Sequence, residues 1–328
     1  MRAAVISRPG GPEVLELRDV PSPEPGAEQI LVRVHASALN RADLLQRRGG
    51  YPAPPGAPAD VPGLEYAGEV AALGPGAREW RVGERVYGLV GGGGHAEYVV
   101  VHERTAARVP DRLSWAEAAA VPEAFITAHD ALVTQAAARP GEAVVVHAAG
   151  SGVGVAAVQL AAALGARALG TARTPAKLER AREYGLHAGL ALGADLAPLA
   201  PFVAEHTGGR GADVALDLVG GPYLNATARA MAELGRLIVI GLVAGRSGEL
   251  DYGVVLRRRL TIRGTVMRAR PLEERIATTR RFAAEVGPLL ERGAVRPVID
   301  AVYPLAEIAR AHERLESNDT FGKVVLEL

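Results

Sequence analysis

The sequence predicts an α/β protein that combines a barrel-like β domain with a doubly wound parallel-sheet domain. Three observations support this prediction. A glycine-rich turn at residues 150–154 joins an apolar strand to an Ala/Leu-rich helix. Short β runs fill the first 122 residues, whereas strands and helices alternate from residue 123 to residue 266. With 328 residues, the chain is expected to form about two domains.

The first 122 residues consist of short β runs between Gly/Pro turns, a pattern typical of a small barrel. The expected strands are Ala3–Ser7, Val14–Asp19, Gln29–Ala38, Tyr66–Leu73, Arg85–Val90 and Ala96–Val101. The tail is expected to be helical at Pro271–Arg292 and Leu305–Leu315 and to end in a strand at Gly322–Leu328. We therefore expect a β domain at 1–122, a nucleotide-binding domain at 123–266, and a return segment at 267–328 that completes the first domain.

The turn at residues 150–154 is the main indication of a ligand. The β-branched run Ala143–Val146 before it is typical of a buried parallel strand, and the helix after it ends at Gly165. Backbone N–H groups and the helix dipole in such a turn are directed at an anion such as a diphosphate. The dinucleotide fingerprint GxGxxG is matched in part, because Ala149 and Ser151 stand at two of its glycine positions. The prediction is a dinucleotide-binding turn formed by Gly150, Ser151, Gly152 and Val153.

The residues after the second strand, Arg167–Ala172, favour NADPH over NADH. An NAD-binding unit carries an acidic residue near this point to bind the ribose 2′-hydroxyl. Here the chain offers Arg173, Thr174 and Lys177, and the first acid is Glu179. Two cations and a hydroxyl suit a 2′-phosphate. The alternative is that Lys177 belongs only to a solvated helix face.

The rest of the central region continues the alternation of strands and helices. Further strands are expected at Val214–Val219, Leu237–Gly241 and Leu260–Arg263, and helices near Pro201–His206 and Pro222–Leu234. Right-handed crossovers between these strands would produce a doubly wound parallel sheet.

Composition excludes several classes of function. The formal net charge is zero, so neither nucleic acid nor an anionic membrane is expected as a partner. The chain has no cysteine, which excludes disulfides, thiolate zinc sites and cysteine nucleophiles. The uncharged stretch from 143 to 166 contains glycines, a serine and a histidine and changes from strand to helix, so it is not expected to span a membrane. We expect a cytoplasmic protein.

Several short motifs occur along the chain in a combination typical of one enzyme family. They are Ser37–Asp43, Arg47–Pro52, Gly63–Gly68, Val82–Val86, Ala119–Pro122 and the Gly152–Gly154 turn. Together they resemble the motifs of the medium-chain dehydrogenase/reductase superfamily. Within it the chain is similar to the zinc-free quinone oxidoreductase branch that includes zeta-crystallin, and most of all to the animal quinone reductases induced by tumour-suppressor signalling. The resemblance implies a GroES-like catalytic domain and a Rossmann domain, and a homodimer formed through the edge strand near Leu260–Arg263.

The resemblance also implies chemistry without a metal. The positions that hold the catalytic zinc in the alcohol dehydrogenase relatives fall at Asn40, Leu64 and Glu123, and leucine cannot bind a metal. A quinone accepts hydride without a Lewis acid because the oxyanion of the product is delocalised. The residues implied to line the nicotinamide pocket are Asn40, Tyr51 and Thr127. Tyr51 is a candidate hydrogen-bond or proton donor to the quinone oxygen, or else a tyrosine that only packs at the end of a loop.

The resemblance assigns cofactor contacts along the chain. Ser151, Gly152 and Val153 match the diphosphate turn, and Arg173, Thr174 and Lys177 match the 2′-phosphate pocket. The other contacts are expected from Val219, Gly241, Leu242 and Asn318. The expected activity is NADPH-dependent reduction of a quinone or another activated carbonyl compound. Two alternatives remain open: an NADPH-dependent alkenal or enone double-bond reductase, and a non-catalytic nucleotide- or RNA-binding protein of the crystallin type.

Overall fold

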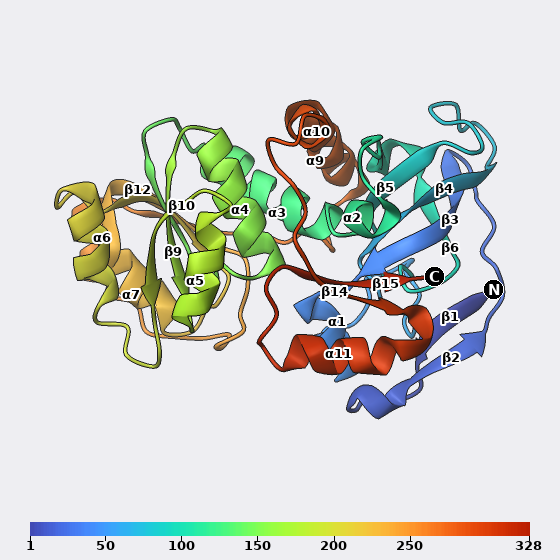
Figure 1. Cartoon of the computed structure of the whole chain (residues 1–328), viewed down its shortest axis with the longest axis horizontal. Coiled ribbons are helices and arrows are strands. Elements are labelled where there is room, and N and C mark those ends of the chain that lie inside the picture. The colour runs from blue at the N-terminus through green and yellow to red at the C-terminus, as the bar shows by residue number, and fades with distance from the viewer. The chain divides into compact units, whose positions relative to one another are not determined.

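The computed structural model describes all 328 residues, which form two compact units (Figure 1). The barrel unit comprises Met1–Ile126 and Met267–Leu328, and the inserted unit comprises Thr127–Val266. In no part of the chain does a helix have the length and apolar character needed to cross a bilayer.

The barrel unit is organised around a seven-stranded sheet in which β14-β15-β3-β4-β5-β7 are neighbours in that order and β6 also pairs with β3. The strands of this sheet are β3 (Gln29–Ala38), β4 (Glu65–Leu73), β5 (Arg85–Leu89), β6 (Tyr98–His102), β7 (Ala106–Arg108), β14 (Ile299–Pro304) and β15 (Lys323–Glu327). A separate two-stranded sheet consists of β1 (Arg2–Ile6) and β2 (Leu15–Asp19). Along β3, Ile30, Val32 and Val34 alternate with more exposed residues and pack into the core with Tyr66 and Val70 of β4.

The C-terminal strand closes this unit. β15 pairs antiparallel with β3, so the red end of the chain lies beside a blue strand in Figure 1. The helices of the unit are α1 (Arg41–Arg47), α2 (Trp115–Ala119), α9 (Leu272–Glu285), α10 (Gly287–Glu291) and α11 (Ile308–Glu316). In α11, Ile308, Ala311, His312 and Leu315 form the buried stripe of an amphipathic helix, which packs against β14 and β15. A π-helical turn, Pro122–Ile126, is the last element of the unit before the inserted unit begins.

The inserted unit contains a six-stranded parallel sheet in the order β10-β9-β8-β11-β12-β13. Its strands are β8 (Ala143–Val146), β9 (Arg167–Ala172), β10 (Leu186–Ala191), β11 (Ala212–Asp217), β12 (Met231–Val239) and β13 (Thr261–Gly264). Its helices are α3 (Thr127–His129), α4 (Gly152–Ala163), α5 (Pro175–Arg182), α6 (Leu199–Thr207), α7 (Tyr223–Ala230) and α8 (Tyr252–Arg258), with a π-helical turn at Asp130–Gln135.

The strand order reverses between β8 and β11, which is the topological switch point of a doubly wound sheet. Helices α4 and α5 cover one face of the sheet and α6 and α7 cover the other (Figure 1). The predicted α/β architecture with a doubly wound parallel sheet is confirmed. Ligands in such folds bind at the carboxyl ends of the strands, so this edge defines where a nucleotide is expected.

Two helix predictions need correction. The helix expected at Pro222–Leu234 ends at Ala230, because β12 begins at Met231 and pairs with the neighbouring β11. The helix expected at Pro271–Arg292 is divided into α9 and α10 between Glu285 and Gly287. Pro288 lies in the first turn of α10, where its missing N–H costs no hydrogen bond.

Candidate functional site

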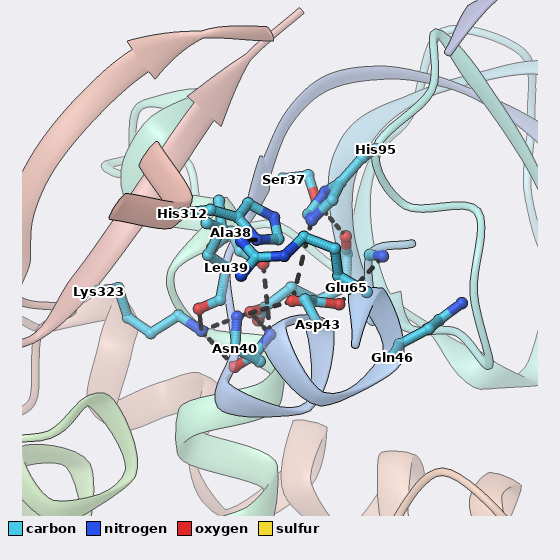
Figure 2. A network of polar contacts seen from close by, with 12 residues as sticks. Ser37, Ala38, Leu39, Asn40, Asp43, Gln46, Glu65, His95, His312 and Lys323 are labelled. Atoms are coloured by element: carbon cyan, nitrogen blue, oxygen red, sulfur yellow. Dashed lines mark hydrogen bonds and ion pairs between the residues drawn. The ribbon is translucent and has the colours of Figure 1, made fainter. Parts of the chain in front are cut away.

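The barrel unit holds a buried polar cluster centred on Lys323, the first residue of β15 (Figure 2). Only 5% of Lys323 is exposed. Its Nζ donates to the carbonyl oxygen of Leu39 at 2.9 Å, to Asn40 Oδ1 at 2.6 Å and to Glu65 Oε1 at 2.7 Å. All three protons of the ammonium group therefore have acceptors.

Glu65, the first residue of β4, is the anion of this cluster and is fully buried. Besides the bond from Lys323, Oε1 accepts a hydrogen bond from Asn40 Nδ2 at 2.8 Å, and Oε2 accepts one from the backbone N–H of Glu123 at 2.7 Å. Burial raises the pKa of Glu65, and the charge of Lys323 opposes this shift. Glu65 thus fixes the side chain of Asn40 and the backbone of Glu123 in one arrangement.

Asn40 is held from a second side by helix α1, of which it is the N-cap residue. Asp43 Oδ2 accepts a hydrogen bond from the Asn40 N–H at 2.7 Å, and Asp43 Oδ1 accepts one from the Gly63 N–H at 3.2 Å. Asp43 is fully buried, and this burial raises its pKa to about 6. The predicted site residue Asn40 therefore lies inside a network that leaves its side chain little freedom.

His95 completes the buried network and carries no charge. Burial, together with the positive charge of Lys323, lowers the pKa of His95 to about 3. Its Nδ1 lies 3.0 Å from Ser37 Oγ, and this hydroxyl donates to the carbonyl oxygen of Glu65 at 2.7 Å. The Nδ1–H tautomer is therefore the one that satisfies Ser37. The neutral ring supplies no cation to Asp43, whose Oδ2 lies 3.8 Å from His95 Nε2.

Tyr51, the second predicted site residue of the barrel unit, packs against Arg268. The guanidinium carbon lies 4.8 Å from the centre of the Tyr51 ring. Arg268 also donates to the carbonyl oxygens of Gly91 at 2.7 Å and Tyr51 at 3.2 Å, and to Gln46 Oε1 at 2.6 Å. Burial raises the pKa of the Tyr51 phenol, with Arg268 opposing the shift, so the hydroxyl stays protonated at neutral pH and can donate a hydrogen bond.

In the inserted unit, the predicted diphosphate turn lies between β8 and α4. Ser151 is the N-cap of α4, and its Oγ accepts a hydrogen bond from the Gly154 N–H at 3.1 Å. The N–H groups of Gly152 and Val153 lie in the first helical turn and have no acceptor within the helix. A Cβ on Gly154 would lie 2.2 Å from the carbonyl oxygen of Ala148, so only glycine fits this position. The turn thus offers two backbone donors and the positive end of a 12-residue helix to an anion.

The residues predicted to bind the 2′-phosphate lie together after β9. Arg173 and Thr174 are exposed, Thr174 is the N-cap residue of α5, and Lys177 lies in the first turn of that helix and is partly buried. Glu179, the next acid along the chain, pairs with Arg182 at 2.9 Å. The end of β9 is therefore followed by two cationic side chains and no adjacent acid.

Val219, Gly241 and Leu242 follow β11 and β12, at the same carboxyl edge of the sheet as the diphosphate turn. The Val219 N–H donates to Asp217 Oδ1 at 2.8 Å, and the Gly241 N–H donates to the Asp217 carbonyl oxygen at 3.1 Å. Half of Leu242 is exposed. The predicted contacts from this unit thus lie along one sheet edge, as binding of an extended dinucleotide requires.

The structure assigns the two remaining predicted residues to different units. Thr127 opens α3 of the inserted unit, where its hydroxyl is buried and has no hydrogen-bond partner in the chain. A buried unpaired hydroxyl costs about 1–3 kcal/mol, which a ligand that bonds to it would recover. Asn318 belongs to the barrel unit, where it follows α11 with φ of 62° and donates from Nδ2 to the Glu316 carbonyl oxygen at 3.0 Å.

Sequence reasoning missed the central residue of the polar cluster. Lys323 had no assigned role in the sequence analysis, and it is buried against Glu65. The available signal was composition: the chain has only two lysines, Lys177 and Lys323, among 37 basic residues. Arg268 carried no signal in the sequence.

The comparisons with known proteins agree with both units. The family model described as an alcohol dehydrogenase GroES-like domain matches residues 26–111, and that described as a zinc-binding dehydrogenase matches residues 189–326. A quinone oxidoreductase of Pseudomonas aeruginosa is 36% identical over 97% of this chain and 96% of its own. A structure described as an NAD-dependent alcohol dehydrogenase is 36% identical with a TM-score of 0.86, and a mycobacterial protein complexed with NADPH is 30% identical with a TM-score of 0.88. Both pairs of chains are covered completely.

The chain belongs to the medium-chain dehydrogenase/reductase superfamily and, within it, to the quinone oxidoreductases. This membership confirms the predicted family and makes the protein an oxidoreductase of the pyridine-nucleotide-dependent type. It also identifies the barrel unit as the GroES-like part of the fold and the inserted unit as the Rossmann part.

Proposed function

We propose that this protein is an NADPH-dependent quinone oxidoreductase that needs no metal. The observation that carries the proposal is the position of Lys323, whose ammonium group bonds to both Asn40 and Glu65. The alcohol dehydrogenase relatives hold zinc at the positions of Asn40, Leu64 and Glu123. In this chain the ammonium group of Lys323 lies beside Asn40 and neutralises the Glu65 carboxylate. The relatives named quinone oxidoreductases, at 31–36% identity, support the same acceptor.

The assigned roles follow from the contacts. Bound NADPH supplies a hydride from C4 of its nicotinamide. The Gly152 and Val153 N–H groups hold the diphosphate, Arg173 and Lys177 hold the 2′-phosphate, and the unpaired Thr127 hydroxyl binds the nicotinamide carboxamide. Val219, Gly241, Leu242 and Asn318 complete the cofactor contacts. Tyr51, fixed by Arg268, donates a hydrogen bond to an oxygen of the quinone.

The first experiment measures oxidation of NADPH and of NADH against ortho-quinones, para-quinones and a short enal, with a chelator present. Quinone reduction with a tenfold or greater preference for NADPH, about 1.4 kcal/mol in the specificity term, is the expected result. Reduction of the enal alone would replace this proposal by double-bond reduction. Tight NADPH binding with no turnover of any acceptor would favour a binding protein.

The cofactor preference is tested separately with Lys177→Ala and Arg173→Ala. Each removes one cation from the 2′-phosphate pocket, so kcat/KM for NADPH should fall at least tenfold while that for NADH stays within about twofold. Arg257→Ala, which removes the same charge from an exposed position on α8, is the matched control. Equal losses of kcat/KM with NADPH and NADH would show that Arg173 and Lys177 do not bind the 2′-phosphate.

We also propose that the protein is a homodimer paired through β13. This strand is an edge of the six-stranded sheet, and Leu260–Arg263 would otherwise leave backbone N–H and C=O groups unpaired. Sedimentation equilibrium should give twice the chain mass of 34.2 kDa. A monomer at micromolar concentration would overturn this proposal without affecting the others.

A further inference from the structure

Glu123 is a carboxylic acid whose backbone is fixed and whose carboxyl group makes no hydrogen bond within the chain. It lies in the π-helical turn Pro122–Ile126, and the residue as a whole is partly buried. The residue also lines a cavity of about 20 Å³, enough for one water molecule. The apolar walls of this cavity include Leu64, Leu89 and Met267, and its polar wall includes Arg268.

The charged groups around Glu123 come from several separate parts of the barrel unit. The carboxyl groups are Glu65 from β4 and Asp43 from α1. The cations are Lys323 from β15, Arg268 from the segment before α9, and Arg275 from α9, which lines the same cavity. The charge of an ionised Glu123 contributes to the raised pKa of the Tyr51 phenol. Lys323 already bonds to Glu65, and Arg268 to Gln46 and two carbonyl oxygens. The buried Nε of Arg275 has no hydrogen-bond partner in the chain.

Burial is the largest influence on Glu123, and the Glu65 carboxylate adds to it. The negative charge of Asp43 acts in the same direction, whereas the positive charges of Lys323 and Arg268 lower the pKa. The net effect raises the pKa of Glu123 to about 8. The side chain is therefore a neutral acid at pH 7 and carries a proton that it can release. A Tyr51 phenol, whose pKa is raised above its ordinary value of 10, is a weaker acid by comparison.

We propose that Glu123 is the proton donor of the reduction, a role that rests on the quinone reductase function proposed above. Net transfer of a hydride to one quinone oxygen gives a hydroquinone monoanion, whose other oxygen needs one proton. The O–H bond of the Glu123 carboxyl breaks as the O–H bond of the hydroquinone forms, and the carboxylate then takes a proton from solvent. NADPH supplies both electrons, and Tyr51 orients the acceptor oxygen.

The deciding variant is Glu123→Gln, which keeps the shape of the side chain and removes the acidic proton. The kcat of the wild type should fall tenfold per pH unit above about pH 8. In the variant, kcat should be about 10²- to 10⁴-fold lower and this alkaline limb should be absent, with the Kd for NADPH unchanged. Glu313→Gln, on the exposed face of α11, is the control for loss of a glutamate and should change nothing.

A second readout does not depend on turnover or on the variant's folding. Infrared difference spectra of the wild type across about pH 6 to 10 should show the C=O band of a protonated carboxyl disappear near pH 8. Absence of this band overturns the proposal. So does an E123Q variant with kcat within threefold of the wild type and an intact alkaline limb.

Failure of the proposed function would be seen separately, in the wild type, as no turnover of any quinone. Reduction of an enal double bond also takes one hydride and one proton. The Glu123→Gln comparison would then be made with the enal, and the same two outcomes would decide the role of Glu123.

Discussion

Replacing Lys323 by methionine should destabilise the barrel unit through the charge it leaves on Glu65. Methionine fills most of the volume, but the Glu65 carboxylate then remains buried with two N–H donors and no cation. Breaking a buried ion pair in this way costs about 3–5 kcal/mol. Glu65 can escape the cost by taking up a proton, and protonating a carboxyl of ordinary pKa 4.5 at pH 7 costs about 3.4 kcal/mol. We therefore expect a loss of about 3 kcal/mol at pH 7 that becomes smaller as the pH falls.

The chain offers a selective probe for this measurement. Both tryptophans, Trp80 and Trp115, lie in the barrel unit, so fluorescence during urea unfolding reports on that unit alone. Lys323→Met should shift this transition to lower urea concentration. The double variant Lys323→Met/Glu65→Gln removes both charges and should be less destabilised than the sum of the single variants, by about 1 kcal/mol or more. A loss below about 1 kcal/mol for Lys323→Met, or additive losses in the cycle, would refute the reasoning.

Two further predictions concern the inserted unit. Gly154→Ala brings a Cβ to 2.2 Å from the Ala148 carbonyl oxygen and should cost about 1–3 kcal/mol and weaken NADPH binding, whereas Gly193→Ala, where a Cβ meets nothing within 4 Å, should do neither. Thermal unfolding and NADPH titration of both variants check this. Burial lowers the pKa of His147 to about 4 from 6.5, so stability is complete above pH 6.5 and is lost as the pH falls toward 4, by up to about 1.4 kcal/mol per pH unit. The slope of the unfolding free energy against pH, between about pH 4 and 6.5, counts the protons taken up on unfolding. In His147→Asn this slope should correspond to one proton fewer, and an unchanged slope would contradict a buried neutral imidazole.

The regular elements of the inserted unit follow closely from local sequence. Ala143–Val146 and Arg167–Ala172 were predicted as strands with the bounds that the structure gives to β8 and β9. These strands are buried in the middle of a parallel sheet, so their apolar runs are continuous and the signal is strong. The change from strand to glycine turn to helix at residues 150–154 was predicted equally well, although two glycines of the fingerprint are replaced. Gly154 is kept at the one position where the Ala148 carbonyl oxygen excludes a side chain.

Predictions were wrong where tertiary packing overrides local propensity. The segment after Ala230 has helix-forming residues but is drawn into β12, which pairs with strands on both sides. The buried polar cluster around Lys323 could not be predicted from the sequence for a related reason. Lys323 is bonded to the carbonyl oxygen of Leu39, 284 positions earlier in the chain, and no local pattern records such a contact. Glu123 was recognised only as a position without zinc, because its environment comes from four separate elements.

The pairing of β15 with β3 also sets an order of events during synthesis. The inserted unit is contiguous, so all its strands have been made by the time Val266 leaves the ribosome. The sheet of the barrel unit lacks β14 and β15 at that moment, and Asn40 and Glu65 have no ammonium partner. The sheet closes only when β15 meets β3, which lies nearly the whole chain length away in sequence. If the inserted unit has already folded, fewer flexible residues separate the two strands, and the entropy cost of bringing them together is smaller. The nucleotide-binding half of the enzyme is thus complete before the half that contains the acidic cluster, and Lys323 is among the last groups to arrive.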